Sequence, residues 1–153
     1  MTAQSEWVFL PPPPSGATEN EIKRRFIVQS LIKTEKAYLT SLETLEFHYK
    51  DELMRMKPPI VDYNQVNMMF GCVGSILEHH RGFAMALDSV IMDWDTNQSI
   101  GNIFVAAFEK QIVLESYSNF INQLPEVLKL IQKLCTRKAF FDFCTRQQEL
   151  QGR

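Results

Sequence analysis

Apolar residues recur at helical spacing from about residue 18 onward. Residues Thr18-Glu19-Asn20-Glu21 have the pattern of a capping box, in which a hydroxyl and a carboxylate satisfy free amides at a helix start. Apolar residues then follow in helical steps, at Ile27/Val28, Leu31/Ile32, Tyr38/Leu39, Leu42, Leu45 and Tyr49. The pattern stops before Pro58 and Pro59, because proline cannot continue a helix. It predicts one helix of roughly 35 residues, about 50 Å long, which is typical of a helical bundle.

The rest of the chain also shows helical periodicity. Helical stretches are predicted over residues 62–92, 100–108, 109–122, 124–134 and 140–144. Asp62 gives a second start signal, Gly71 and Gly74 predict a break, and Ser99 is a candidate cap. Pro125 either kinks a helix or stands in the first turn of the next one. No stretch alternates as a strand does, so the sequence predicts an all-α fold, an elongated helical bundle.

Composition narrows the class of protein. The 153 residues are 45% hydrophobic and 22% charged, which is typical of one globular domain. A formal net charge of −2 argues against a nucleic-acid partner, since phosphate binding needs a basic surface. No apolar run reaches the ~18 residues of a transmembrane segment, and no secretory signal precedes the domain. Three widely spaced cysteines, Cys72, Cys135 and Cys144, predict reduced thiols and a cytoplasmic protein.

The first 17 residues are expected to be a flexible, proline-rich leader, followed by the domain at residues 18–147 and a tail at 148–153. The run from Pro11 to Pro14 has the extended conformation that Src-homology-3 domains recognise, so it is a candidate ligand for one. A plain linker is the alternative, and the run alone favours it, because no arginine or lysine lies close to the prolines.

Glu35 departs from the pattern of the first predicted helix. It lies between Leu31 and Tyr38, within the apolar stripe, and no cation lies one turn before or after it. A carboxylate on such a face needs a partner or an exit to water. From the residues alone, Glu35 either leans into solvent at the edge of the stripe or pairs with a lysine or arginine of another helix.

Four segments together resemble one known domain. They are residues 28–42 (VQSLIKTEKAYLTSL), 69–83 (MFGCVGSILEHHRGF), 100–104 (IGNIF) and 117–122 (YSNFIN). In this order they are similar to conserved blocks of the Dbl-homology domain of Rho-family guanine-nucleotide exchange factors, over about residues 22–145. The resemblance implies a flattened, elongated bundle of helices, usually followed by a pleckstrin-homology domain.

The resemblance also implies an activity without covalent chemistry. Such factors bind the switches of a small GTPase of the Rho, Rac or Cdc42 type and stabilise its nucleotide-free state. In the family, the glutamate of the Thr-Glu pair contacts the first switch, and Glu35 stands at that position. Its partners would then be donors on the GTPase, with Thr34 as a lesser contact. The alternative is a non-catalytic helical scaffold or adaptor for a GTPase or another protein. The sequence has no nucleophile elbow, glycine-rich phosphate loop or metal-ligand cluster, so an ordinary enzyme is not expected.

The second block has a structural role in the family. Its matching residues, expected in the core that holds the bundle together, are Phe70, Ile76, His80, Arg81 and Phe83. His79 and His80 do not have the spacing of a metal site, and we expect neither a metal nor a cofactor.

In the family, a long GTPase-contacting helix follows the segment that matches Phe140 to Cys144, and this chain ends at Arg153. The expectation is therefore a fragment or short isoform, truncated before that helix, with reduced exchange activity. Recruitment to membranes would depend on regions outside it.

Overall fold

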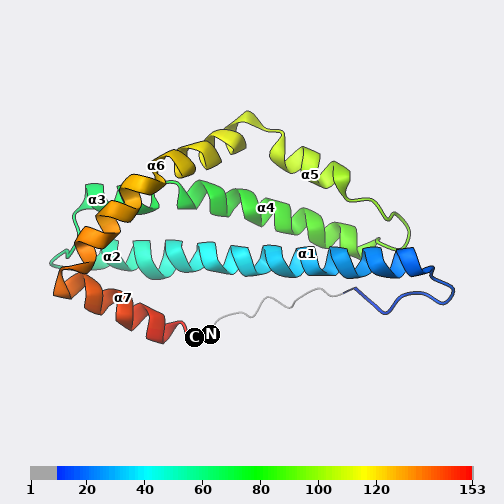
Figure 1. Ribbon diagram of the computed structural model, residues 1–153, viewed down its shortest axis with the longest axis horizontal. Coiled ribbons are helices and arrows are strands. Elements are labelled where there is room, and N and C mark those ends of the chain that lie inside the picture. Colours follow the sequence, from blue (N-terminus) through cyan, green and yellow to red (C-terminus); the bar gives the residue numbers. More distant parts are fainter. Residues whose placement is uncertain (1–9, 153) are drawn as a thin grey trace.

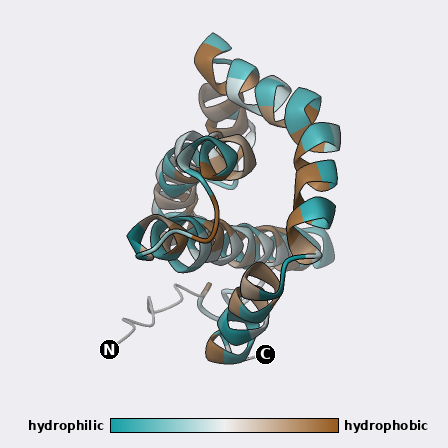
Figure 2. Ribbon diagram, turned by 90° about the vertical axis from the view of Figure 1, so that its left-hand side faces the viewer, coloured by the Kyte–Doolittle hydropathy of each residue, from teal (hydrophilic) through white to brown (hydrophobic). Residues whose placement is uncertain are grey.

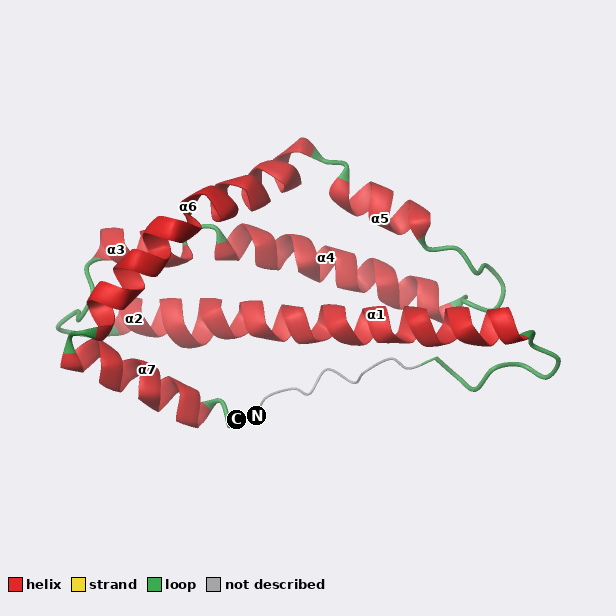
Figure 3. Cartoon of the chain, viewed as in Figure 1, coloured by secondary structure: helices red, strands yellow, loops and turns green. Residues whose placement is uncertain are grey.

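A computed structural model describes residues 10–152, and every regular element within that range is helical. The elements are α1 (Glu19–Glu43), a π-helical segment η1 (Thr44–Lys50), α2 (Asp51–Arg55), α3 (Tyr63–Phe70), α4 (Val73–Met92), α5 (Gly101–Phe108), α6 (Gln111–Cys135) and α7 (Lys138–Leu150). Figure 3 shows the loops between the helices, with an extended one between α4 and α5. The predicted all-α fold is confirmed.

The first predicted helix is a continuous rod made of α1, η1 and α2 (Figure 1). Its capping box is present, because Thr18 accepts from the amide of Glu21 and Glu21 accepts from the amide of Thr18. The rod ends at Arg55, before the prolines, as predicted. The wider turns of η1 were not predicted, since no proline or glycine marks them. There the amide of Asp51 donates to the carbonyl of Glu46.

The predicted break near the glycines separates α3 from α4. Asp62 caps α3 in a second capping box with Gln65. The helix ends at Phe70, and Gly71 donates its amide to the carbonyl of Asn67 at 2.8 Å. A Cβ at position 71 would lie 2.5 Å from that same carbonyl oxygen, so the close turn requires a glycine.

Two local predictions were wrong, at Ser99 and at the tail, and the structure selects one of the two alternatives at Pro125. Ser99 does not cap α5, because Ile100 is the residue at the cap and makes no side-chain hydrogen bond there. The two stretches around Pro125 form one helix, α6, which changes direction part-way along its length (Figure 3). Pro125 removes one amide donor, and the surrounding turn is exposed enough for water to bind the freed carbonyl. Helix α7 continues to Leu150, into the predicted tail.

The helices form a layered arrangement around the rod. Helix α4 lies beside α1 along much of its length, and α5 and α6 form an arch on the other side of α4 (Figures 1 and 2). Helix α6 then crosses to the far end of the rod, where α7 turns back. Hydrophilic residues predominate on the outer side of the arch in Figure 2.

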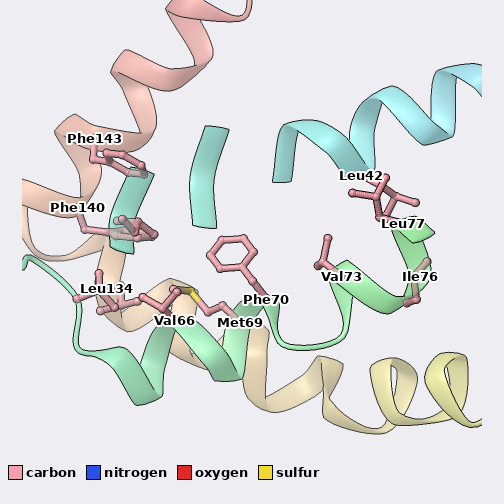
Figure 4. Packing of buried hydrophobic residues seen from close by; sticks show 12 residues of the cluster. Leu42, Val66, Met69, Phe70, Val73, Ile76, Leu77, Leu134, Phe140 and Phe143 are labelled. Carbon is pink, nitrogen blue, oxygen red and sulfur yellow. The ribbon is translucent and has the colours of Figure 1, made fainter. Parts of the chain in front are cut away.

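Two clusters of buried residues hold these helices. Cluster A gathers at the end of the rod, from α3, α4, α6, α7 and the rod itself (Figure 4); its buried residues are Leu42, Leu53, Val61, Val66, Met69, Phe70, Val73, Ile76, Leu77, Leu134, Phe140 and Phe143. Cluster B lies between α1 and α4 and consists of Val28, Ile32, Phe83, Leu87, Ile91 and Trp94. No helix among the described residues combines the length and apolar character needed to cross a bilayer.

The described part of the proline-rich leader contacts the bundle. Leu10 packs against cluster B, and the carbonyl of Pro11 accepts a hydrogen bond from the buried guanidinium of Arg25. Arg25 needs such acceptors because an unpaired buried cation is costly. The contacts at Leu10 and Pro11 therefore depart from the expected flexible leader, and residues 1–9 lie outside the described part of the chain.

Candidate functional site

Glu35 faces α4 rather than open solvent. Its Oε1 atom is hydrogen-bonded to Nδ1 of His80, and the two side chains are 11% and 7% exposed. Neither expectation from the residues alone was right, because the partner is a histidine and the carboxylate is mostly buried. A carboxylate can only accept a hydrogen bond, so Nδ1 of His80 carries the proton in this contact.

The other ring nitrogen of His80 contacts a third helix. Nε2 is hydrogen-bonded to the hydroxyl of Tyr117 on α6. In the neutral ring, a protonated Nδ1 leaves Nε2 as an acceptor, so Tyr117 donates. We call this chain of contacts the Glu35–His80–Tyr117 bridge. It joins α1, α4 and α6 through polar groups between the two core clusters.

Aromatic rings surround the bridge and lower its exposure to water. Tyr38 lies edge-on to the ring of His80, with ring centroids 4.7 Å apart, and Phe83 and Phe108 pack farther out. Burial, followed by the charges of Tyr38 and Glu35, raises the pKa of Tyr117 to about 12. Burial and the carboxylate of Glu35 also raise the pKa of Tyr38. Both hydroxyls therefore keep their protons at neutral pH and can donate.

An exposed strip of α1 runs beside Glu35. Its residues, at helical spacing and exposed, are Ile27, Thr34 and Tyr38 of α1, continued by Leu45 in the first turn of η1. Thr34 donates its hydroxyl to the carbonyl of Ser30 at 2.9 Å, which leaves its oxygen accessible. We call this strip the α1 flank. It places an exposed hydroxyl and apolar side chains next to a nearly buried carboxylate.

A sequence profile of the RhoGEF domain matches residues 27–153, which is most of the chain. The chain belongs to the RhoGEF family. RhoGEF domains are exchange factors rather than enzymes, because no covalent bond is made or broken by them.

Relatives support the same assignment. The chain is 36% identical over 140 residues to the Rho guanine nucleotide exchange factor 10-like protein of Bos taurus. It is 33% identical over 142 residues to Rho guanine nucleotide exchange factor 10 of Homo sapiens. These matches cover 91% and 92% of this chain but only 11% and 10% of the relatives, so the chain spans about a tenth of their length. No solved structure matches the chain.

The second block of the RhoGEF domain divides between core and surface. Phe70, Ile76, His80 and Phe83 are buried, whereas Arg81 lies at the surface with its side chain 47% exposed. Arg81 lies 3.5 Å from a carboxylate oxygen of Glu43, and its guanidinium lies over the ring of Phe47. The expectation of Arg81 as a core residue is wrong. It links α4 to the end of α1 from outside.

The remaining candidate residues lie away from the bridge. Pro11 and Pro14 are exposed, in the segment before α1, which lies on the opposite side of the rod from α6 (Figure 1). Among residues 10–152, no group of three or more histidine, cysteine or acidic side chains could hold a metal ion.

Sequence reasoning missed the partners of Glu35. His80 and Tyr117 are 45 and 37 residues from their partners in the bridge, so no search along one helix could find them. Both residues do occur in the segments that resemble the family. The sequence therefore contained both residues in recognisable segments, but it did not reveal their contact with Glu35.

Proposed function

We propose that this RhoGEF domain promotes GDP release from a Rho-family small GTPase by binding its switch regions and stabilising the nucleotide-free state. The observation that carries the proposal is the family match over residues 27–153. The relatives are Rho guanine nucleotide exchange factors, which supports it. The protein would act in the cytoplasm.

The α1 flank with Glu35 is the proposed contact for the first switch. Glu35 stands at the family's switch-contacting position, and Thr34 lies exposed beside it. A carboxylate has about four lone-pair positions, and the hydrogen bond from His80 occupies one of them. Donors of the GTPase can therefore bind the same carboxylate without breaking the bridge. A hydrogen bond to a charged group contributes about 1.5–3 kcal/mol.

The direct test is release of fluorescent GDP from purified Rho, Rac and Cdc42 proteins in the presence of the chain. Faster release from at least one of them supports the exchange function. Tight binding to the nucleotide-free GTPase without faster release would instead support the non-catalytic adaptor. Absence of both binding and release contradicts the proposal.

A Src-homology-3 domain is a second proposed partner. The side chains from Pro11 to Pro14 are exposed, although the carbonyl of Pro11 is bound to Arg25. Titration of labelled chain with isolated Src-homology-3 domains tests the proposal, with Pro12→Ala and Pro14→Ala as variants. Equal binding of the variants would contradict recognition through the prolines.

A further inference from the structure

The Glu35–His80–Tyr117 bridge places an ordered carboxylate at the edge of an exposed strip. Glu35 is 11% exposed, and its neighbours Thr34 and Tyr38 on the α1 flank are open to solvent. A glutamate at a helix surface normally samples many rotamers, and ordering it costs up to about 2 kcal/mol. Here the hydrogen bond from His80 already holds the carboxylate in one place.

The hydroxyl of Tyr117 determines which nitrogen of His80 can carry the proton. As a donor to Nε2, it favours the tautomer with the proton on Nδ1, the nitrogen that faces Glu35. Without that hydroxyl, the ring is free to place its proton on Nε2. The bare Nδ1 lone pair would then face a carboxylate, and the two acceptors would repel each other.

We infer that His80 and Tyr117 are positioning residues for GTPase engagement: they hold the carboxylate of Glu35 ready to accept hydrogen bonds from the first switch. The inference rests on the proposed function and adds two residues from other helices to it. Preorganised acceptors bind more tightly because their conformational freedom has already been lost before binding. Helix α6 thus helps to hold the side chain of Glu35 on α1, because its Tyr117 contacts His80 on α4.

A double-mutant cycle tests this role. Tyr117→Phe keeps the ring and removes the hydroxyl, and it should lower stimulated GDP release about two- to tenfold, the effect of one hydrogen bond. In a Glu35→Gln background the same change should have no further effect, because the side chain it positions has lost its charge. Tyr49→Phe is the matched control, since Tyr49 is another half-buried tyrosine whose ring lies edge-on to Phe143.

The exchange activities of two variants at His80 distinguish a positioning role from a purely structural one. Asparagine at position 80 places an amide N–H near the position of Nδ1, whereas leucine fills space without a donor. His80→Asn should therefore retain more exchange activity than His80→Leu. Urea midpoints of all variants separate loss of folding from loss of positioning.

The outcomes distinguish the two proposals. Equal losses from Tyr117→Phe in both backgrounds, or equal activity of the asparagine and leucine variants, overturn the positioning role and leave the exchange function standing. A wild-type chain that neither releases GDP nor binds a nucleotide-free GTPase overturns the proposed function, and the positioning role with it.

Discussion

The guanidinium of Arg25 on α1 is buried and paired with the carboxylate of Asp95, in the loop that follows α4. The two partners differ in exposure, with side chains 6% and 36% exposed. Removing one partner leaves the other residue without an opposite charge beside it. The cost in folding stability depends on whether water can reach the remaining charged group. The pair therefore predicts an asymmetry between the two substitutions.

Asp95→Ala should destabilise the fold more than Arg25→Met. Loss of Asp95 leaves a buried cation, at a cost of about 3–5 kcal/mol, whereas Arg25→Met keeps the apolar stem and leaves a carboxylate that water can reach. Urea midpoints measure both. Lys23→Ala is the control, because its exposed pair with Glu19 should contribute about 0–1 kcal/mol. A smaller effect of Asp95→Ala would contradict the buried pair.

Removal of residues 1–17 should lower the melting temperature. The described part of that segment supplies Leu10 to cluster B and the carbonyl of Pro11 to Arg25. Loss of one buried contact and one acceptor, about 2–3 kcal/mol, corresponds to a shift of roughly 4–12 °C. In an Arg25→Met background the shift should be smaller. Differential scanning fluorimetry gives both values, and an unchanged melting temperature would show that these contacts contribute nothing.

Glu35→Gln and Glu35→Ala should separate activity from stability. Glutamine still offers an oxygen to Nδ1 of His80, so its urea midpoint should stay close to that of wild type, while GDP release falls about ten- to a hundredfold with the loss of a charge-assisted contact. Alanine leaves the buried N–H of His80 without an acceptor, which should lower the folding stability by about 1–3 kcal/mol. Glu43→Gln, at a carboxylate elsewhere on α1, should leave GDP release unchanged and lower the stability by at most about 1 kcal/mol, because its pair with Arg81 is exposed.

Stability should fall as the pH falls below the ordinary range of histidine, and His79 should account for part of that loss. Burial, followed by the charges of His80 and Lys110, lowers the pKa of His79 below its usual 6.5, and Glu35 opposes this shift. The unfolded chain then binds a proton at higher pH than the folded chain does. The contribution of His79 to folding stability is therefore fully present above pH 6.5. It is lost as the pH falls through the lowered pKa that His79 has in the folded chain.

His79→Phe tests this pH dependence. The substitution removes the titration and keeps a ring that can pack edge-on against Phe108. It should also stabilise the fold at neutral pH, since Nε2 of His79 is buried without a hydrogen-bond partner among the described residues. Urea midpoints at pH 7.5 and 5.5 should differ less in the variant than in wild type. An equal difference would assign the pH dependence to other groups.

Local signals in the sequence predicted most of the fold. The capping boxes at Thr18 and Asp62 and the glycine at position 71 act within one turn of the backbone, and the structure has each of them. The wide turns of η1 were not predictable in this way. The segment packs against α3, α4 and α7, and no window along the rod contains those helices.

The candidate site was predictable only in part, for the same reason. The position of Glu35 within the apolar stripe marked it as unusual, but the choice between solvent and a partner depends on which helices approach α1. His80 looked like a packed histidine whose ring N–H had an unidentified partner, and Tyr117 carried no polar signal of its own. Their contact with Glu35 exists only after three helices have assembled.

The π-helical turns of η1 act as a change of phase within the rod. A helix of constant period presents one stripe along its whole length, whereas an extra residue in a turn rotates everything that follows by ~100°. The rod can therefore face α4 along α1 and still direct Leu53 of α2 into cluster A with Phe140 and Phe143 of α7. A regular α-helix over the same residues of segment 44–50 would turn Leu53 away from that cluster, whereas deleting a single residue there would restore a constant period and keep Leu53 facing it. The π-helical turns thus determine which helices the two halves of the rod can bind.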